Sequence, residues 1–228
     1  DEQLILQETS KNIFDGITQE LIYDALILST IVFIERDPAY GYVAARLLLK
    51  KLHVEVCGEQ SYFEDVHFYK ESFVAGIQKG VEIEALDPRM AEYDLDYLAS
   101  QLCPERDMQF DFMGLRVLYE RYFLQNEKKR YELPQAFWMR VAMGLCYNES
   151  NKNERAVEFY HNFSQFKYVS GTPTLLHSGL MRPQLSSCFL TTVEDDLIHI
   201  FKCYSDNAQL SKWSGGLAND WTNVRATG

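Results

Sequence analysis

Apolar residues recur every three or four positions through most of this chain, a spacing that is typical of helices with one buried face. Thr18 precedes one such segment and is suited to cap a helix that runs to about residue 36. Pro38 follows its end, and a second amphipathic helix over residues 40–53 should pair with it as a hairpin. Further helices are predicted over residues 63–80, 88–102, 112–123, 134–147 and 153–163.

After the last of these helices the pattern changes, and short strands are predicted over residues 168–169 and 187–193. Gly171 and Pro173 should turn the chain between the two strands. Asp195 is then a suitable N-cap for a helix. The inner face of that helix should consist of Leu197, Ile200, Phe201, Tyr204 and Ala208. A strand followed by a helix, with chemistry at the strand end, is usual in α/β barrels, so the fold predicted is mainly α and ends in the start of such a barrel.

The composition excludes several classes of function. The 228 residues carry a formal net charge of −11, which argues against a surface that follows the phosphates of a nucleic acid. No membrane span is predicted, because the longest apolar run, residues 25–34, falls short of the roughly 18 residues that a span needs. The chain shows no cationic and apolar leader, which favours a cytoplasmic protein.

The cysteines and histidines are scattered and form no pattern of metal ligands. The five cysteines are Cys57, Cys103, Cys146, Cys188 and Cys203. Their odd number and wide separation argue against a disulfide framework. Cys103, Cys146 and Cys203 lie in apolar helical patterns, where a small buried side chain is the simpler interpretation. Composition alone would give Cys188 the same interpretation.

Cys188 lies within a longer pattern that resembles a known family. The run SGTPTLLHSGLMRPQLSSCFLTTVEDDL, followed by LSKWSGGLANDWTNVRATG, resembles the start of the catalytic barrel in the large subunit of class I ribonucleotide reductase. Upstream, FDFMGLRVLYERYF and ELPQAFWMRVAMGLCYNE resemble the helical domain that precedes that barrel. The segment from FDGITQELIYDALILS to YGYVAARLLLKKL resembles the later helices of an ATP-cone. The resemblance implies an ATP-cone tail over residues 1–54, the helical domain over residues 55–166 and a truncated barrel over residues 167–228.

The resemblance implies a redox role for Cys188. In this family the ribose loses its 2'-hydroxyl by a radical route that begins at a thiyl cysteine, and two other cysteines supply the reducing equivalents. Cys188 matches the first of that reducing pair. Ser187 and Thr172 match positions that contact the substrate, Ser187 toward the ribose and Thr172 toward the diphosphate, and hydroxyls suit both tasks without adding charge. Without the resemblance, a strand-edge hydroxyl and a turn-stabilising side chain would be the simpler interpretations.

The resemblance also implies an allosteric site made of Asp195, Lys212 and Arg225. Family members hold a deoxynucleoside triphosphate effector near the dimer interface, where an aspartate matching Asp195 bonds the sugar and basic residues bind the phosphates. The adjacent Asp196 leaves open which carboxylate takes the sugar, although the spacing to Lys212 favours Asp195. The alternative is a helix cap with solvated surface charges. Tyr23 and Lys51 stand where better-known ATP-cones have histidines, so residues 1–53 are assigned no role.

The whole enzyme implied by the resemblance is a homodimeric ribonucleoside-diphosphate reductase for DNA precursor synthesis. A small radical-generating subunit would hold the metal cofactor, thioredoxin or glutaredoxin would regenerate the thiols, and ATP and deoxynucleoside triphosphates would be effectors. This chain would bind no cofactor directly. It is interpreted as an inactive fragment, because it opens without Met and because the thiyl cysteine and second redox cysteine should lie beyond residue 228.

Two alternatives to this assignment stay open. A cobalamin-dependent reductase shares the GTPT and SSC neighbourhood, although PQAFWMRVAMGL favours the form that depends on a small subunit. A non-catalytic helical module that binds nucleotides, with Cys188 merely buried, is the other.

Overall fold

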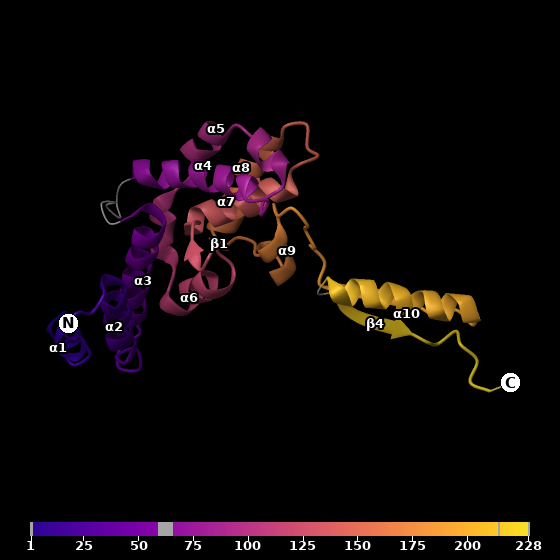
Figure 1. Ribbon diagram of the computed structural model, residues 1–228, viewed down its shortest axis with the longest axis horizontal. Helices are drawn as coiled ribbons and strands as arrows, with labels where there is room; N and C mark the ends of the chain where they lie inside the picture. Colours follow the sequence, from indigo (N-terminus) through magenta and orange to yellow (C-terminus); the bar gives the residue numbers. More distant parts are fainter. Residues whose placement is uncertain (1, 59–65, 214, 228) are drawn as a thin grey trace.

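The computed structural model describes residues 2–58, 66–213 and 215–227, and helices dominate it (Figure 1), which confirms the mainly α prediction. The α-helices are α1 (Glu2–Ser10), α2 (Gln19–Ile31), α3 (Ala39–Cys57), α4 (Val66–Glu82), α5 (Leu95–Ser100), α6 (Phe112–Arg121), α7 (Pro134–Leu145), α8 (Lys152–Ser164), α9 (Thr172–His177) and α10 (Leu197–Lys212). The remaining elements are the 3₁₀ helices η1 (Pro88–Glu92) and η2 (Pro104–Gln109) and the strands β1 (Gln125–Asn126), β2 (Lys129–Arg130), β3 (Cys188–Thr192) and β4 (Gly216–Asp220).

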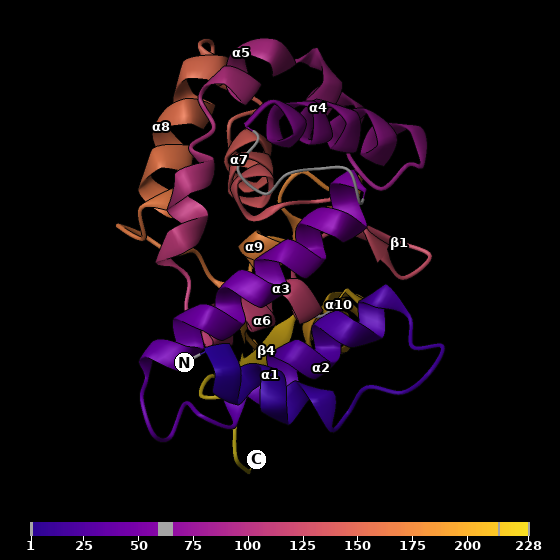
Figure 2. The ribbon, with the colours of Figure 1, turned by 90° about the vertical axis from the view of Figure 1, so that its left-hand side faces the viewer.

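The N-terminal helices α1, α2 and α3 lie together on one side of the molecule (Figure 2). Thr18 caps α2 as predicted, since its side-chain oxygen accepts a hydrogen bond from the amide of Leu21 at 3.4 Å. Helix α2 ends at Ile31, earlier than predicted, and α3 continues to Cys57, beyond the predicted end at residue 53. The extra turn of α3 is held from outside, because Glu55 accepts a hydrogen bond from the amide of Arg130 at 2.6 Å.

The helices from α3 to α9, which we call the helical body, share one core. This core surrounds α7, which Figure 2 shows between α8 and α4. Every residue from Pro134 to Gly144 is buried, so this helix has no solvent face. Pro134 begins it, as predicted, because proline at the first turn has no amide hydrogen that the helix would need. Rings of Phe137 and Trp138 pack with their centroids 4.7 Å apart. The dense aromatic residues of this region therefore serve packing.

A buried carboxylate lies beside the start of α7. Asp107 accepts hydrogen bonds from the hydroxyl of Tyr69 at 2.9 Å and from the side-chain amide of Gln135 at 2.7 Å. Tyr160 extends this network by donating to Gln135 at 2.8 Å. Burial raises the pKa of Asp107 to about 7, despite these hydrogen bonds and the positive charge of Arg46, which lower it.

Two of the predicted helical segments differ in detail. Instead of one helix over residues 88–102, the structure has η1 and α5, separated by the extended residue Tyr93. The Tyr93 hydroxyl donates to the carbonyl of Met143 at 2.6 Å, so a contact with α7 anchors the residue at the break. Asp94 then caps α5 by accepting from the amide of Tyr97 at 2.9 Å. The start predicted at residue 63 lies outside the described residues, and α4 is described from Val66.

The region after α8 corrects the strand predicted over residues 168–169, which is irregular in the structure. Gly171 and Pro173 do not make a simple turn, because they begin the short helix α9. The sequence also did not predict the hairpin of β1 and β2. Its turn residues Glu127 and Lys128 have positive φ angles of 50° and 68°, without the glycine that usually marks such a turn.

The C-terminal elements β3, α10 and β4 extend away from the helical body (Figure 1). Strands β3 and β4 pair in parallel, with Cys188 opposite Gly216. The predicted inner face of α10 is wrong, because none of its five residues is buried: Leu197, Phe201 and Tyr204 are 69%, 65% and 56% exposed. The buried residue of α10 is Cys203. Two strands cover only one side of the helix, and its apolar residues extend beyond that side.

Candidate functional site

Thr172 is the first residue of α9 and is exposed, with Gly171 as the N-cap. Its hydroxyl oxygen lies 3.1 Å from the hydroxyl oxygen of Tyr122, which follows the end of α6. The two residues are 50 positions apart, so this contact joins α9 to the helical body. Sequence reasoning missed Tyr122, because a tyrosine in an aromatic-rich amphipathic helix has no distinguishing pattern.

A buried ion pair holds the end of α9 against α7. The guanidinium of Arg140 is fully buried, and its Nη1 donates to the carbonyl of Ser178 at 2.7 Å. Its Nε donates to Oε1 of Glu132 at 2.7 Å. The Ser178 hydroxyl donates in turn to the carbonyl of Val141 at 2.8 Å. Arg140 and Glu132 were not singled out in the sequence, because the role of a buried charged residue is recognised only once its partner is known.

The backbone after α9 also approaches α7 very closely. A Cβ atom placed on Gly144 would lie 2.2 Å from the amide nitrogen of Gly179, so only glycine fits at position 144. Gly179 itself has a φ of 84°, a conformation that other residues rarely adopt. Together with Arg140, these glycines fix the position of α9 on the helical body.

Two hydrogen bonds connect α9 to the segment that leads into β3. The Thr174 hydroxyl donates to the carbonyl of Leu185 at 3.2 Å, and Nδ1 of His177 lies 2.9 Å from the carbonyl oxygen of Gln184. Ser187 and Cys188 follow a few residues later. Among the described residues, no direct hydrogen bond joins Thr172 to Ser187 or Cys188.

Cys188 is exposed, whereas Cys146 and Cys203 are buried and Cys103 is half-buried. It is the first residue of β3, so it lies at the amino end of the strand and not at the carboxyl end, where α/β barrels usually carry their chemistry. The amide of Gly216 donates to the carbonyl of Ser187 at 2.8 Å, which starts the pairing there. A Cβ atom on Gly216 would lie 2.9 Å from the carbonyl oxygen of Ser187, so the close pairing with Ser187 favours glycine there, whereas the sulfur of Cys188 lies at an ordinary contact distance of 3.9 Å.

The structure brings together two of the three residues predicted to bind an effector. Nε of Arg225 lies 2.9 Å from Oδ2 of Asp195, and both side chains reach the surface. Asp196, and not Asp195, caps α10, because its Oδ1 accepts from the amide of His199 at 2.9 Å. The predicted cap was therefore wrong by one residue, and the capping role leaves Asp195 free to pair with Arg225.

Lys212 lies apart from that pair. It is the last residue of α10, which spans 16 residues and is therefore about 24 Å long, and Asp195 precedes the first turn. The ammonium of Lys212 lies 5.5 Å from the ring centroid of Trp213. Within one chain, the predicted triad is thus an ion pair and a separate lysine.

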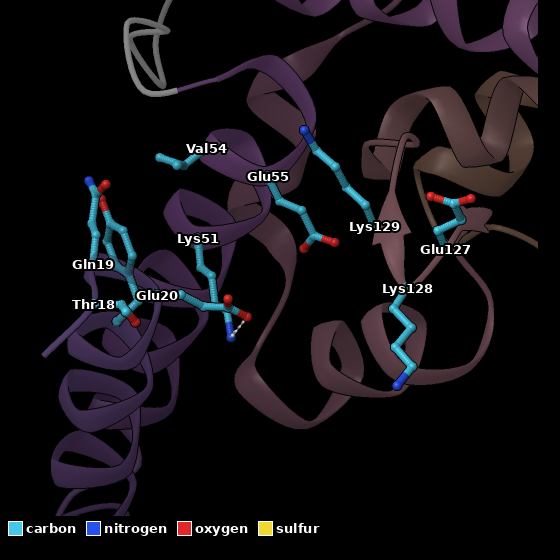
Figure 3. A pocket seen from close by; sticks show the side chains of 10 residues that line it. Thr18, Gln19, Glu20, Lys51, Val54, Glu55, Glu127, Lys128 and Lys129 are labelled. Carbon is cyan, nitrogen blue, oxygen red and sulfur yellow. Dashed lines mark ion pairs between the residues drawn. The ribbon is translucent and has the colours of Figure 1, made fainter.

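A cavity of about 540 Å³ lies between the N-terminal helices and the β1–β2 hairpin (Figure 3). Figure 3 shows Lys51 of α3 directed toward Glu20 of α2. Nζ of Lys51 lies 2.6 Å from Oδ1 of Asp24 and 3.7 Å from Oε1 of Glu20. Glu55 and Lys129 also line the cavity, so its walls carry charges of both signs. Because Asp24 and Glu20 already pair with Lys51, we assign this cavity no ligand.

The described residues contain neither a candidate metal site nor a candidate membrane-spanning helix. Within residues 2–58, 66–213 and 215–227, no group of three or more histidine, cysteine, aspartate or glutamate residues could hold a metal ion. No helix in the same ranges combines the length and the apolar character needed to cross a membrane.

Comparison with known proteins identifies two consecutive family domains. Residues 108–183 match the family model described as "Ribonucleotide reductase, all-alpha domain". Residues 186–228 match the family model described as "Ribonucleotide reductase, barrel domain". The order agrees with the predicted helical part followed by the start of a barrel. The expected domain limits at residues 54 and 166 stay predictions, and α3 crosses the first of them.

Individual relatives extend the match to the whole chain. The "Ribonucleoside-diphosphate reductase subunit alpha" of Chlamydia pneumoniae is 46% identical over 230 residues, covering 100% of this chain and 22% of that protein. The protein of the same name from Helicobacter pylori is 38% identical over 216 residues, covering 94% of this chain and 26% of that protein. The "Ribonucleoside-diphosphate reductase large subunit" of Arabidopsis thaliana is 28% identical over 231 residues, covering 100% of this chain and 28% of that protein.

The chain thus spans about a quarter of the length of these relatives. Their names give no support to the cobalamin-dependent alternative. With the two domain matches and the match along its full length, the chain belongs to the family of ribonucleotide reductase large (alpha) subunits.

Proposed function

We propose that this chain is part of a large subunit that reduces ribonucleoside diphosphates to 2'-deoxyribonucleoside diphosphates for DNA synthesis. The observation that carries the proposal is the exposed thiol of Cys188 beside Gly216 on a parallel strand pair, in contrast to the buried Cys146 and Cys203. A thiol that is to meet a sugar must be reachable, and the exposed position of Cys188 meets that requirement.

The proposed chemistry consumes two thiols for each sugar. The 2'-hydroxyl leaves as water, a hydrogen takes its place on the carbon, and two thiols become one disulfide, so two electrons pass from sulfur to the ribose. Cys188 supplies one of the thiols. The second thiol and the thiyl radical that begins the reaction belong to parts of the full-length subunit outside this chain.

Ser187 and Thr172 are proposed to hold the substrate beside that thiol. Ser187 directly precedes Cys188, and its hydroxyl can exchange hydrogen bonds with a ribose hydroxyl. Thr172 can donate to a phosphate oxygen from the exposed start of α9. Support for a common site comes from the bonds of Thr174 and His177 to the segment before Ser187, which tie α9 to the strand.

Asp195 and Arg225 are proposed to bind the deoxynucleoside triphosphate effector. The ion pair at 2.9 Å is exposed, so a ligand can reach both side chains and take the place of the partner of each. Asp195 would accept a hydrogen bond from the sugar hydroxyl, and Arg225 would bind phosphate oxygens. Lys212, at the opposite end of α10, keeps its proposed role as a phosphate ligand through a second large subunit, which the proposed homodimer would supply.

The proposed partners follow from the reaction. A small subunit with a metal-radical cofactor would generate the radical, and thioredoxin or glutaredoxin would reduce the disulfide. A cytoplasmic location belongs to the same proposal, because the thiols must be kept reduced between turnovers. ATP is proposed as a further effector of the complete enzyme.

Replacement of the thiol tests the proposal. In the complete large subunit with its small subunit, Cys188→Ser should abolish multiple turnovers of a ribonucleoside diphosphate, because one reducing equivalent is lost. Product formed per subunit with an excess of dithiol reductant is the measurement. Cys103→Ser is the matched control, since Cys103 is half-buried on the helical body and should be dispensable. Unchanged steady-state turnover in Cys188→Ser would contradict the proposed role.

A further inference from the structure

The hydroxyl of Tyr122 is held in place by the helical body. Tyr122 follows the last turn of α6, where its amide donates to the carbonyl of Leu118 at 2.9 Å. Its ring packs edge-on against Phe137, with centroids 6.3 Å apart, and Phe137 is completely buried. Backbone and ring are therefore both fixed, so the position of the hydroxyl oxygen is set before any ligand arrives.

That hydroxyl faces Thr172 at an accessible position. The two oxygens are 3.1 Å apart, a hydrogen-bond distance, and either atom could be the donor in the free protein. Tyr122 also borders an open cavity of about 360 Å³, together with Leu175 of α9. The pair of hydroxyls thus lies at the edge of the helical body and not within its packed core.

A bound phosphate would decide which of the two hydroxyls donates. Phosphate oxygens of a nucleoside diphosphate act as acceptors near neutral pH, so Thr172 must give them its only hydrogen. Its oxygen then keeps free lone pairs, and the hydroxyl of Tyr122 can donate to one of them. The resulting chain runs from Tyr122 to Thr172 to the phosphate, and each hydroxyl donates once.

We propose that Tyr122 is a positioning residue for the diphosphate of the substrate and acts by orienting the hydroxyl of Thr172. This inference rests on the proposed function, because it presumes that Thr172 binds the substrate. Tyr122 itself touches no substrate atom. Its contribution is to hold the Thr172 oxygen so that the Thr172 hydrogen points outward.

The test is a double-mutant cycle in the complete large subunit with its small subunit, using CDP as substrate. Tyr122→Phe keeps the ring and removes the donor, so the KM for CDP should rise about 2- to 12-fold, the value of one hydrogen bond, while kcat stays within about twofold. Thr172→Val should raise KM further. In the Thr172→Val background, Tyr122→Phe should add nothing, because its only route to the substrate is gone.

Matched controls separate orientation from damage to the fold. Tyr119→Phe removes the hydroxyl of a tyrosine three residues earlier, in α6, which donates to Glu55 at 3.0 Å, and it should leave KM unchanged. Thr172→Ser retains the hydroxyl, so its KM for CDP should rise less than that of Thr172→Val. A melting temperature of Tyr122→Phe close to that of the parent protein would exclude unfolding as the cause of a higher KM.

The outcomes distinguish this inference from the function beneath it. An unchanged KM in Thr172→Val would remove Thr172 from the substrate site, and the proposal for Tyr122 would fall with that part of the proposed function. A raised KM in Thr172→Val with an unchanged KM in Tyr122→Phe would overturn the role of Tyr122 alone. Equal effects of Tyr122→Phe in both backgrounds would also overturn it, since the residue would then act without Thr172.

Discussion

Removal of the charge of Arg140 should destabilise the helical body strongly. In Arg140→Met the buried carboxylate of Glu132, only 5% exposed, loses both of its contacts with the guanidinium, at 2.7 and 3.3 Å. It keeps one hydrogen bond, from the amide of Leu124 at 3.1 Å. The carbonyl of Ser178 loses its donor as well. Breaking a buried ion pair from one side costs about 3–5 kcal/mol, and we expect the free energy of unfolding to fall by this amount.

Urea unfolding followed by tryptophan fluorescence would measure the loss. Trp138 is 2% exposed and reports on the core around α7, whereas Trp213 and Trp221 are 46% and 40% exposed. The matched control is Arg116→Met, which removes an exposed pair with Glu120, at 2.7 Å, and should cost at most about 1 kcal/mol.

A second variant separates the unpaired charge from the lost packing. Arg140→Met combined with Glu132→Leu removes both charges, so it should recover a large part of the stability lost in Arg140→Met. A loss in Arg140→Met no greater than that of Arg116→Met would refute the reasoning. So would a double variant less stable than the single one, because the cost would then not come from a stranded carboxylate.

Two further predictions concern a buried acid and the surface ion pair. The folded pKa of Asp107, about 7, lies above its unfolded value of about 4, so its stabilising contribution is complete below about pH 4 and is lost as the pH rises through 7. Relative to the parent protein, Asp107→Asn should gain stability by about 1.4 kcal/mol for each pH unit in that window. Urea unfolding of both proteins at pH 5 and pH 8 measures this, and the same difference in the free energy of unfolding at both pH values would contradict it. Arg225→Ala should weaken deoxynucleoside triphosphate binding to the complete subunit about 10- to 100-fold, by loss of a charged hydrogen bond. Calorimetric titration would show this, and an unaltered affinity would remove Arg225 from the effector site.

Local signals in the sequence located most of the helices. Thr18 and Pro134 act within a single helical turn, through a side-chain oxygen or a missing amide hydrogen, so their effect is readable from their neighbours alone. Apolar spacing likewise predicted α6 and α8 to within about two residues of their bounds. The GTPT and SSC segments identified the family because their order is preserved along the chain.

The sequence could not distinguish the roles of neighbouring residues that have the same chemistry. Asp195 and Asp196 are both acceptable caps, and the choice depends on which carboxylate faces the amide of His199 and which faces Arg225, 30 residues away. Helix α9 stands where a turn was predicted, and here too a distant residue matters, because Arg140 of another helix holds its end. The apolar face of α10 was predicted correctly as apolar but wrongly as buried.

The sequence by itself determined where most of the helices form, which family the chain resembles and which thiol and hydroxyls are candidates for chemistry. Only the tertiary structure decided that the thiol of Cys188 is exposed, that α9 is fixed by the pair of Arg140 and Glu132, and that Tyr122 meets Thr172. The physical reason is range: caps and periodicity act over a few residues, whereas burial and hydrogen bonding of these side chains depend on partners many residues distant, which only the folded chain brings into contact.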